Sequence, residues 1–306
     1  MARRLTVPIL VLVLAAPAFA RELTSAYVIT AVANKAGVAG TDWHSDLTLY
    51  NPQSRPLTIK IFFLPSGQDN ASHGAPMAPP ITLQPWQTLN LWDILGSSGF
   101  DARGWTGALL VYADTAASGC PNTAGDPSCD FAAFDRNYTL DPGRTDGEFG
   151  QAFPGFPANL GVDGSVIAYL PQISDDAVFR TNVGVASWTA DWVTVRVDLQ
   201  DEAGNIIARR DHSVPPYGHM QWRLEDGVTG GTLAAYIVAG PSDAMVYPYA
   251  TVVNWATGDA TTVEAQITSV GLSAESLSVR RSAQRAVPRG LPAPSFSLEG
   301  LARRGR

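Results

Sequence analysis

The strongest constraint on the fold is an internal repeat. Residues 46–64 ("DLTLYNPQSRPLTIKIFFL") align without a gap with residues 182–200 ("NVGVASWTADWVTVRVDLQ"), 136 positions further along the chain. In both copies aliphatic residues alternate with polar ones at the same positions, and this period of two predicts two β-strands joined by a polar turn. One face of each strand is expected to be buried and the other exposed to water.

The repeat continues beyond this pair of strands. Residues 83–92 align with 214–223, residues 107–114 resemble 233–240, and residues 131–144 align with 246–259. The offset decreases by eleven residues before the last block, so the first copy contains an insertion there. A period above 100 residues indicates duplication of a whole domain, since solenoid repeats have periods of only about 20 to 50 residues.

Short strand patterns, frequent Gly and Pro, and the lack of a sustained helical period predict an all-β fold. We predict two tandem related β-sandwich (immunoglobulin-like) domains, at residues 21–160 and 161–270. Residues 1–20 are predicted to be a signal peptide. Residues 271–306, rich in Arg and Pro, are predicted to form a disordered tail.

The N-terminus has the pattern of an export signal. Arg3 and Arg4 precede an uncharged, mostly apolar stretch over residues 5–16, and the small-x-small sequence Ala18-Phe19-Ala20 follows. No other window approaches the roughly 20 apolar residues of a spanning helix. We therefore expect an exported protein without a transmembrane segment, located in the periplasm, on the cell surface or in the medium.

The charge limits the class of partner, and the cysteine pair fits an exported chain. The net charge is −7, and the seven Arg of residues 280–306 leave the remainder more acidic still, which argues against a nucleic-acid partner. Cys120 and Cys129 lie in a Gly/Pro/Asn-rich loop within or at the edge of the insertion. In an exported chain such a pair is predicted to form a disulfide.

At the head of one strand in each copy stand an aromatic residue, a basic residue, Ser or Thr, and Asp or Asn. These are Trp43-His44-Ser45-Asp46 in the first copy and Phe179-Arg180-Thr181-Asn182 in the second. This pattern resembles the exported tandem β-sandwich repeat proteins of Gram-negative bacteria of the myxobacterial and acidobacterial kind. The resemblance covers the chain to about residue 265 and implies a fold class and a compartment, but no activity.

His44, Ser45 and Asp46 are also the residue types of a hydrolytic triad. On a strand, adjacent side chains point to opposite faces, so Ser45 cannot contact both neighbours. The second copy replaces all three residues and loses the base and the nucleophile. We therefore interpret Ser45 and Asp46 as residues that satisfy backbone groups at the start of a strand.

No catalytic motif, phosphate-binding Gly loop or zinc motif occurs, so we predict no catalytic residues and no cofactor. Asp114, Asp126 and Asp130 lie in one acidic loop and are candidate calcium ligands. Their spacing lacks the regular oxygen pattern of a calcium loop, and Asp is also a common turn residue.

The eight Trp residues suggest an aromatic binding surface. Trp86 and Tyr217 follow Pro at equivalent turns. Trp188 and Trp192 flank a hairpin turn of the second copy, at positions where the first copy has Pro52 and Pro56. These four aromatic residues are the candidate ligand-binding residues, although packing between the domains would also explain Trp188 and Trp192.

These observations lead to three hypotheses for function. The first is a non-catalytic exported structural or binding protein whose partner is an envelope glycan or another exported protein. The second is a lectin-like carbohydrate-binding module, which calcium could assist. The third is a hydrolase whose site residues are distant in sequence.

Overall fold

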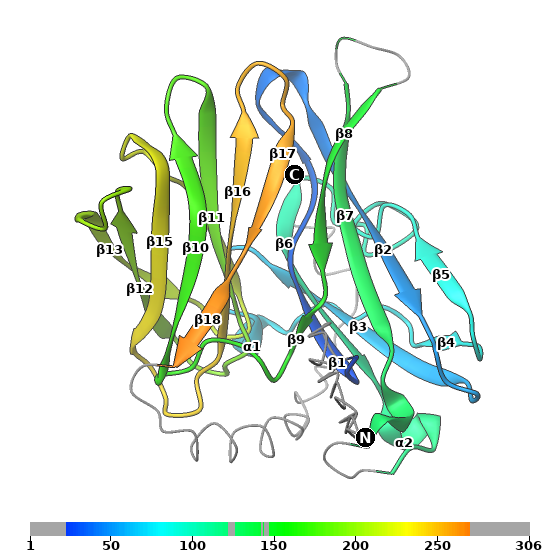
Figure 1. Ribbon diagram of the computed structural model, residues 1–306. Helices are drawn as coiled ribbons and strands as arrows, with labels where there is room; N and C mark the ends of the chain where they lie inside the picture. Colours follow the sequence, from blue (N-terminus) through cyan, green and yellow to red (C-terminus); the bar gives the residue numbers. More distant parts are fainter. Residues whose placement is uncertain (1–22, 122–125, 142, 144–146, 270–306) are drawn as a thin grey trace, which may run out of the picture.

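The computed structural model describes residues 23–121, 126–141, 143 and 147–269 (Figure 1). β-strands dominate these residues, and every pairing between named strands is antiparallel, so the all-β prediction is confirmed. The predicted signal peptide and the predicted tail lie outside the described residues. Among the described residues, no helix is long and apolar enough to cross a membrane.

The first half of the chain forms two sheets that share strand β1. Sheet I has the order β4-β3-β6-β1-β9, and sheet II has the order β5-β2-β7-β8. The strands of sheet I are β1 (Ala26–Ala36), β3 (Leu57–Pro65), β4 (Ile81–Leu83), β6 (Trp105–Ala113) and β9 (Phe156–Pro157). Those of sheet II are β2 (Asp42–Tyr50), β5 (Thr88–Leu91), β7 (Ala132–Leu140) and β8 (Glu148–Pro154). Two residue pairs next to the β1–β2 connection link the sheets.

The second half repeats this topology strand for strand. Sheet III has the order β13-β12-β15-β10-β18, and sheet IV has the order β14-β11-β16-β17. Sheet III contains β10 (Val166–Asp175), β12 (Val193–Gln200), β13 (Ile206–Val214), β15 (Val228–Ala239) and β18 (Gln266–Ser269). Sheet IV contains β11 (Phe179–Ser187), β14 (His219–Arg223), β16 (Val246–Asn254) and β17 (Ala260–Glu264).

The register of the strands agrees with the sequence alignment. Leu57 pairs with Leu83 in sheet I, and the aligned residues Val193 and Val214 pair in sheet III. Trp86 and Tyr217, aligned in the two copies, both have positive φ, 60° and 42°. Because this conformation is uncommon for non-Gly residues, its recurrence shows that the duplicated turns keep the same backbone path.

Each half has its own apolar core between its two sheets. Alternate residues of β2 and β3, such as Leu47, Leu49 and Ile59, are fully buried in the first core. Aligned residues such as Val183, Val185 and Val195 are buried in the second core. The period-two pattern of the sequence therefore places alternate residues of these strands in an apolar core.

A third apolar cluster joins the two domains. The outer face of sheet I packs against one end of the outer face of sheet IV. Sheet I contributes Ala26, Val28, Phe62, Leu64, Ala108 and Leu110, and sheet IV contributes Ala186 and Tyr247. Gly184 permits the tight packing of sheet IV, since an added Cβ would lie 2.2 Å from the Tyr249 ring. Sheet I is thus apolar on both of its faces, which is the pattern of a sheet that is buried on both faces.

Short helices and a disulfide occupy the connections. These segments are η1 (Val38–Gly40), α1 (Asn70–His73), α2 (Thr115–Ser118) and η2 (Pro127–Cys129). The last two belong to the insertion between β6 and β7, where Cys120 and Cys129 form the predicted disulfide with a Cα–Cα distance of 6.0 Å. Both cysteines are buried against the first core, so the bridge fastens the insertion to the domain.

Candidate functional site

His44, Ser45 and Asp46 lie on β2 of sheet II, and their side chains are divided between its two faces. Ser45, Leu47 and Leu49 are fully buried, whereas His44 is partly exposed and Tyr50 is exposed. Adjacent side chains on a strand point to opposite faces. His44, Asp46, Thr48 and Tyr50 therefore belong to the outer face of sheet II.

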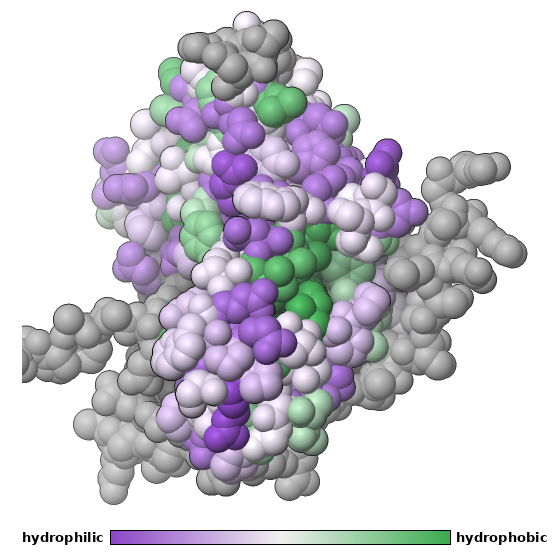
Figure 2. All heavy atoms as spheres, turned by 90° about the vertical axis from the view of Figure 1, so that its right-hand side faces the viewer, coloured by the Kyte–Doolittle hydropathy of each residue, from purple (hydrophilic) through white to green (hydrophobic). Residues whose placement is uncertain are grey.

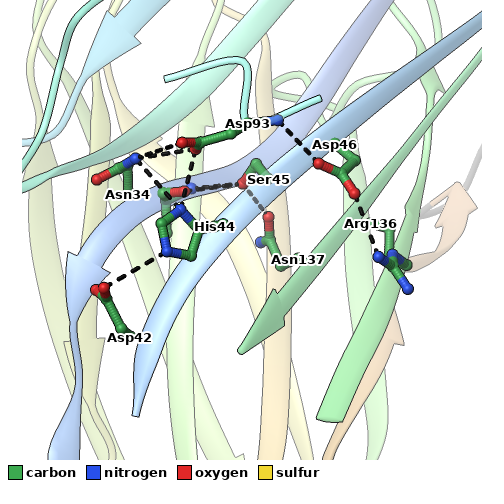
Figure 3. Close-up of polar contacts among 9 residues, drawn as sticks. Asn34, Asp42, His44, Ser45, Asp46, Asp93, Arg136 and Asn137 are labelled. Atoms are coloured by element: carbon green, nitrogen blue, oxygen red, sulfur yellow. Dashed lines mark hydrogen bonds and ion pairs between the residues drawn. The ribbon is translucent and has the colours of Figure 1, made fainter. Parts of the chain in front are cut away.

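A network of charged and polar groups covers the β2 start on this face (Figure 3). His44 Nδ1 lies 3.1 Å from Asp93 Oδ1, and His44 Nε2 lies 3.5 Å from Asp42 Oδ2. The Asn34 side-chain amide donates to both carboxylate oxygens of Asp93, at 2.9 and 3.1 Å. The His44 ring is thus held between two carboxylates.

Asp46 connects this network to the neighbouring strand. Its Oδ1 accepts the Asp93 N–H at 2.9 Å, and its Oδ2 accepts from Arg136 at 3.2 Å. Arg136 also pairs with Glu148 at 3.0 Å, and its guanidinium lies 4.5 Å from the centre of the Tyr138 ring. Asp46 fixes the backbone after β5, as a backbone-satisfying Asx residue is expected to do.

Ser45 points away from His44 and Asp46 (Figure 3). Its hydroxyl accepts the Ala33 N–H at 2.7 Å and hydrogen-bonds the Asn137 side chain. Asn137 in turn donates to the Ala31 carbonyl at 3.2 Å. Ser45 therefore stabilises an irregular part of β1, where the register with β6 shifts between Ile29 and Val32. These contacts do not form a relay of the triad kind.

Beneath the face, Asp135 is fully buried on the inner side of β7. Among the described residues, neither of its carboxylate oxygens has a hydrogen-bond partner. Burial raises the pKa of Asp135 well above its usual range, and the nearby Asp46 adds to this shift. The aligned residue in the second domain is Ala250, which shows that the fold does not require a carboxylate here.

Exposed aromatic side chains accompany the polar network. Tyr50, Phe134 and Trp92 are 37%, 42% and 65% exposed. Tyr50 pairs with Thr88, and Thr48 lies between Phe134 and Asn90 in the sheet, with Thr48 donating to Asn90 at 2.8 Å. Figure 2 views the side of the molecule that carries β2, β4 and β5, where an apolar area is bordered by hydrophilic side chains.

The four aromatic candidates from the sequence do not form one surface. Trp188 and Tyr217 pack against the cluster between the domains, so interdomain packing accounts for both. Trp86 and Trp192 are 62% and 56% exposed, at turns of different domains. Tyr50, Phe134 and Trp92 were missed because they are far apart in the sequence, and the pairing of β2 with β5 and β7 brings their segments together.

The calcium candidates have other partners. Asp114 caps α2, accepting the Ala117 N–H, and pairs with Lys60 at 2.7 Å, which lowers the pKa of Asp114. Asp126 caps η2 through the Ser128 N–H, and the Asp130 carbonyl accepts from Gln53. In the part of the chain that the structure describes, no group of three or more His, Cys, Asp or Glu could hold a metal ion.

A second polar chain crosses the domain interface and was also missed, because its members are distant in sequence. His219 Nδ1 hydrogen-bonds the Ser66 hydroxyl, and His219 Nε2 lies 2.9 Å from the Tyr249 hydroxyl. Ser66 also contacts Thr106 at 3.0 Å. Complete burial lowers the pKa of His219 to about 3, far from the value that suits a general base at neutral pH.

Comparisons with protein-family models, curated proteins and solved structures found no match for this chain.

Proposed function

We propose that this chain is a non-catalytic exported binding or structural protein, and that the outer face of sheet II is its binding surface. One observation carries the proposal: the equivalent face in the second domain is already a docking surface. Part of the sheet IV outer face is buried against sheet I. A duplicated face that packs in one copy and is exposed in the other is a natural place for a partner.

Exposed aromatic residues of the first domain align with buried residues on the outer face of sheet IV. Phe134 aligns with Tyr249, which is 1% exposed, and Tyr50 aligns with Ala186, which is fully buried. Tyr249 packs edge-on against Phe153 of the first domain, with ring centres 5.6 Å apart. Phe134 and Tyr50 remain exposed, so the first domain presents large aromatic side chains where the second domain makes its contact.

We propose a non-catalytic role because of the partners and the location of His44 and His219. Both ring nitrogens of His44 face carboxylates, and the neighbouring Ser45 hydroxyl is engaged by Ala33 and Asn137. His219 does contact a serine, but within the domain interface. Export is supported by the N-terminal pattern of the sequence and by the disulfide, which persists in oxidising compartments.

A carbohydrate is the second, more specific candidate for the ligand. Tyr50, Phe134 and Trp92, which follows the last residue of β5, supply flat apolar rings. Asn90, Thr48 and Glu148 supply donors and acceptors on sheet II. Flat rings beside hydrogen-bonding groups suit a sugar, which has an apolar ring face and a rim of hydroxyl groups. This arrangement replaces the turn residues Trp188 and Trp192 as the basis for the carbohydrate hypothesis.

The test is binding of the full chain to a panel of insoluble and soluble polysaccharides, measured by co-sedimentation and affinity electrophoresis. The variants Trp92→Ala and Tyr50→Ser should weaken retention at least tenfold. Trp192→Ala, which removes an equally exposed indole from the other domain, is the matched control and should bind as the parent does. Retention that is lost only in the Trp192 variant would contradict the assignment of the face. Absence of retention would remove the carbohydrate candidate.

A further inference from the structure

Sheet IV carries a pair of arginines at the end of its outer face away from the domain contact. Arg180 lies on β11, and Arg223 lies on β14 opposite Asn182, two residues along β11 from Arg180. Both guanidinium groups lie over the indole of Trp255, at 4.7 Å for Arg223 and 5.4 Å for Arg180. Stacking on an aromatic face leaves the N–H edges of a guanidinium available for hydrogen bonds.

In the described part of the chain, these two arginines have no strong counter-ion. Among the described residues, no carboxylate oxygen lies within 4.0 Å of Arg180, and Arg223 has only Asp175, at 4.0 Å. The other nearby acids are engaged: Asp176 accepts from Val178, Phe179 and Thr229, and Asp226 pairs with Arg210. Burial, with Arg223 adding to it, lowers the pKa of Arg180, as expected for a cation without a partner.

The first domain shows which carboxylates the second domain lacks at this position. Arg180 aligns with His44, whose ring lies between Asp42 and Asp93. The residue aligned with Asp42 is Val178. Leu91 pairs with Leu47 as Trp222 pairs with the aligned Val183, so Trp92 corresponds to Arg223. The Ile94 N–H donates to the Ser45 carbonyl just as the Leu224 N–H donates to the aligned Thr181 carbonyl. The first domain therefore has one more residue between these two points, and Asp93 has no counterpart in the second domain. Both domains keep the basic residue, but among the described residues only the first domain places carboxylates against it.

We propose that Arg180 and Arg223, supported by Trp255, form a binding site for a tetrahedral oxyanion of the phosphate or sulfate type. The anion takes the place that Asp42 and Asp93 hold in the first domain. Two guanidinium groups on adjacent strands can each donate two N–H bonds to such an anion, and their charges match a doubly charged group. The anion is either free in solution or esterified on a lipid headgroup.

The test uses the full chain with inorganic phosphate as the probe, followed through the arginine Nε–H signals in nuclear magnetic resonance spectra. Phosphate should shift the Arg180 and Arg223 signals with saturation. Arg180→Gln should weaken binding at least tenfold, and Arg209→Gln, which removes an Arg of sheet III already paired with Asp198, should leave it unchanged.

A second variant restores the carboxylate of the first domain. Val178 is 53% exposed, so Val178→Asp should fold normally and should weaken phosphate binding at least tenfold by pairing with Arg180. Flotation with phosphatidylglycerol vesicles, but not with phosphatidylcholine vesicles, that is lost in this variant would identify a lipid headgroup as the source of the anion. Phosphate binding without flotation would identify a soluble anion. No shift with phosphate and no flotation, or equal binding by the Val178→Asp protein, would overturn the proposal.

Discussion

The buried His219 gives the sharpest prediction about stability. Its pKa falls from 6.5 in the unfolded chain to about 3 in the folded protein because it is completely buried. Between these values the unfolded state binds more protons, so stability rises with pH and is lost as pH falls from about 6.5 towards 3. The full effect of this one group is about 4 to 5 kcal/mol, at about 1.4 kcal/mol per pH unit.

The substitution His219→Gln isolates this effect. At pH 7 the variant should be less stable than the parent by about 1 to 3 kcal/mol, since the hydrogen bonds to Ser66 and Tyr249 are lost or weakened. The variant lacks the titrating group, so the difference should shrink below pH 6.5 and reverse before pH 4. Urea unfolding of both proteins from pH 7.5 to 4 measures it. A difference that stays constant over this range would refute the burial argument for His219.

Three further predictions concern stability. Asp135→Ala, which copies Ala250 of the duplicate, should stabilise the protein by about 1 to 3 kcal/mol at pH 7, because an unpartnered buried carboxyl is removed. Since the pKa of Asp135 is raised, the gain should shrink as the pH falls towards about 4, and a gain independent of pH in urea unfolding would be inconsistent with this reasoning. Replacing Cys120 and Cys129 together by Ser should cost about 2.5 to 3 kcal/mol in the same assay, because a closed loop of this length restricts the unfolded chain; an unchanged midpoint would argue against it. Gly184→Ala should cost about 1 to 3 kcal/mol, because the new methyl group clashes with the Tyr249 ring, whereas Gly204→Ala, at an open turn of positive φ, is the comparison for a purely conformational cost.

The fold class could be predicted from the sequence because the two copies repeat the same alternation of apolar and polar residues. Aligned pairs such as Leu57 with Val193 and Leu83 with Val214 fall at the same places in the two sheets. The interpretation of Ser45 and Asp46 as backbone-satisfying residues also agrees with their contacts to Ala33 and Asp93. Strand alternation alone was enough for both inferences, because each depends on neighbours within the same strand or pair of strands.

The candidate site could not be predicted in the same way. Which outer face is buried between domains depends on the position of one domain against the other, and alternation does not contain that information. Trp188 and Trp92 are both large aromatics near strand ends, yet Trp188 packs in the interface and Trp92 is 65% exposed. The absence of a counter-ion for Arg180 among the described residues likewise depends on contacts between strands far apart in the sequence.

The central claim is that the outer face of sheet II is covered by a partner where the protein works. Hydroxyl-radical footprinting tests it most directly, by comparing side-chain oxidation of the purified chain with oxidation of the chain in the envelope and medium fractions of the cells that export it. We expect protection of Tyr50, Trp92 and Phe134 in one of those fractions, with unchanged oxidation of Trp86 and Trp192. Equal oxidation of Tyr50, Trp92 and Phe134 in all samples, or protection confined to Trp86 and Trp192, would contradict the claim.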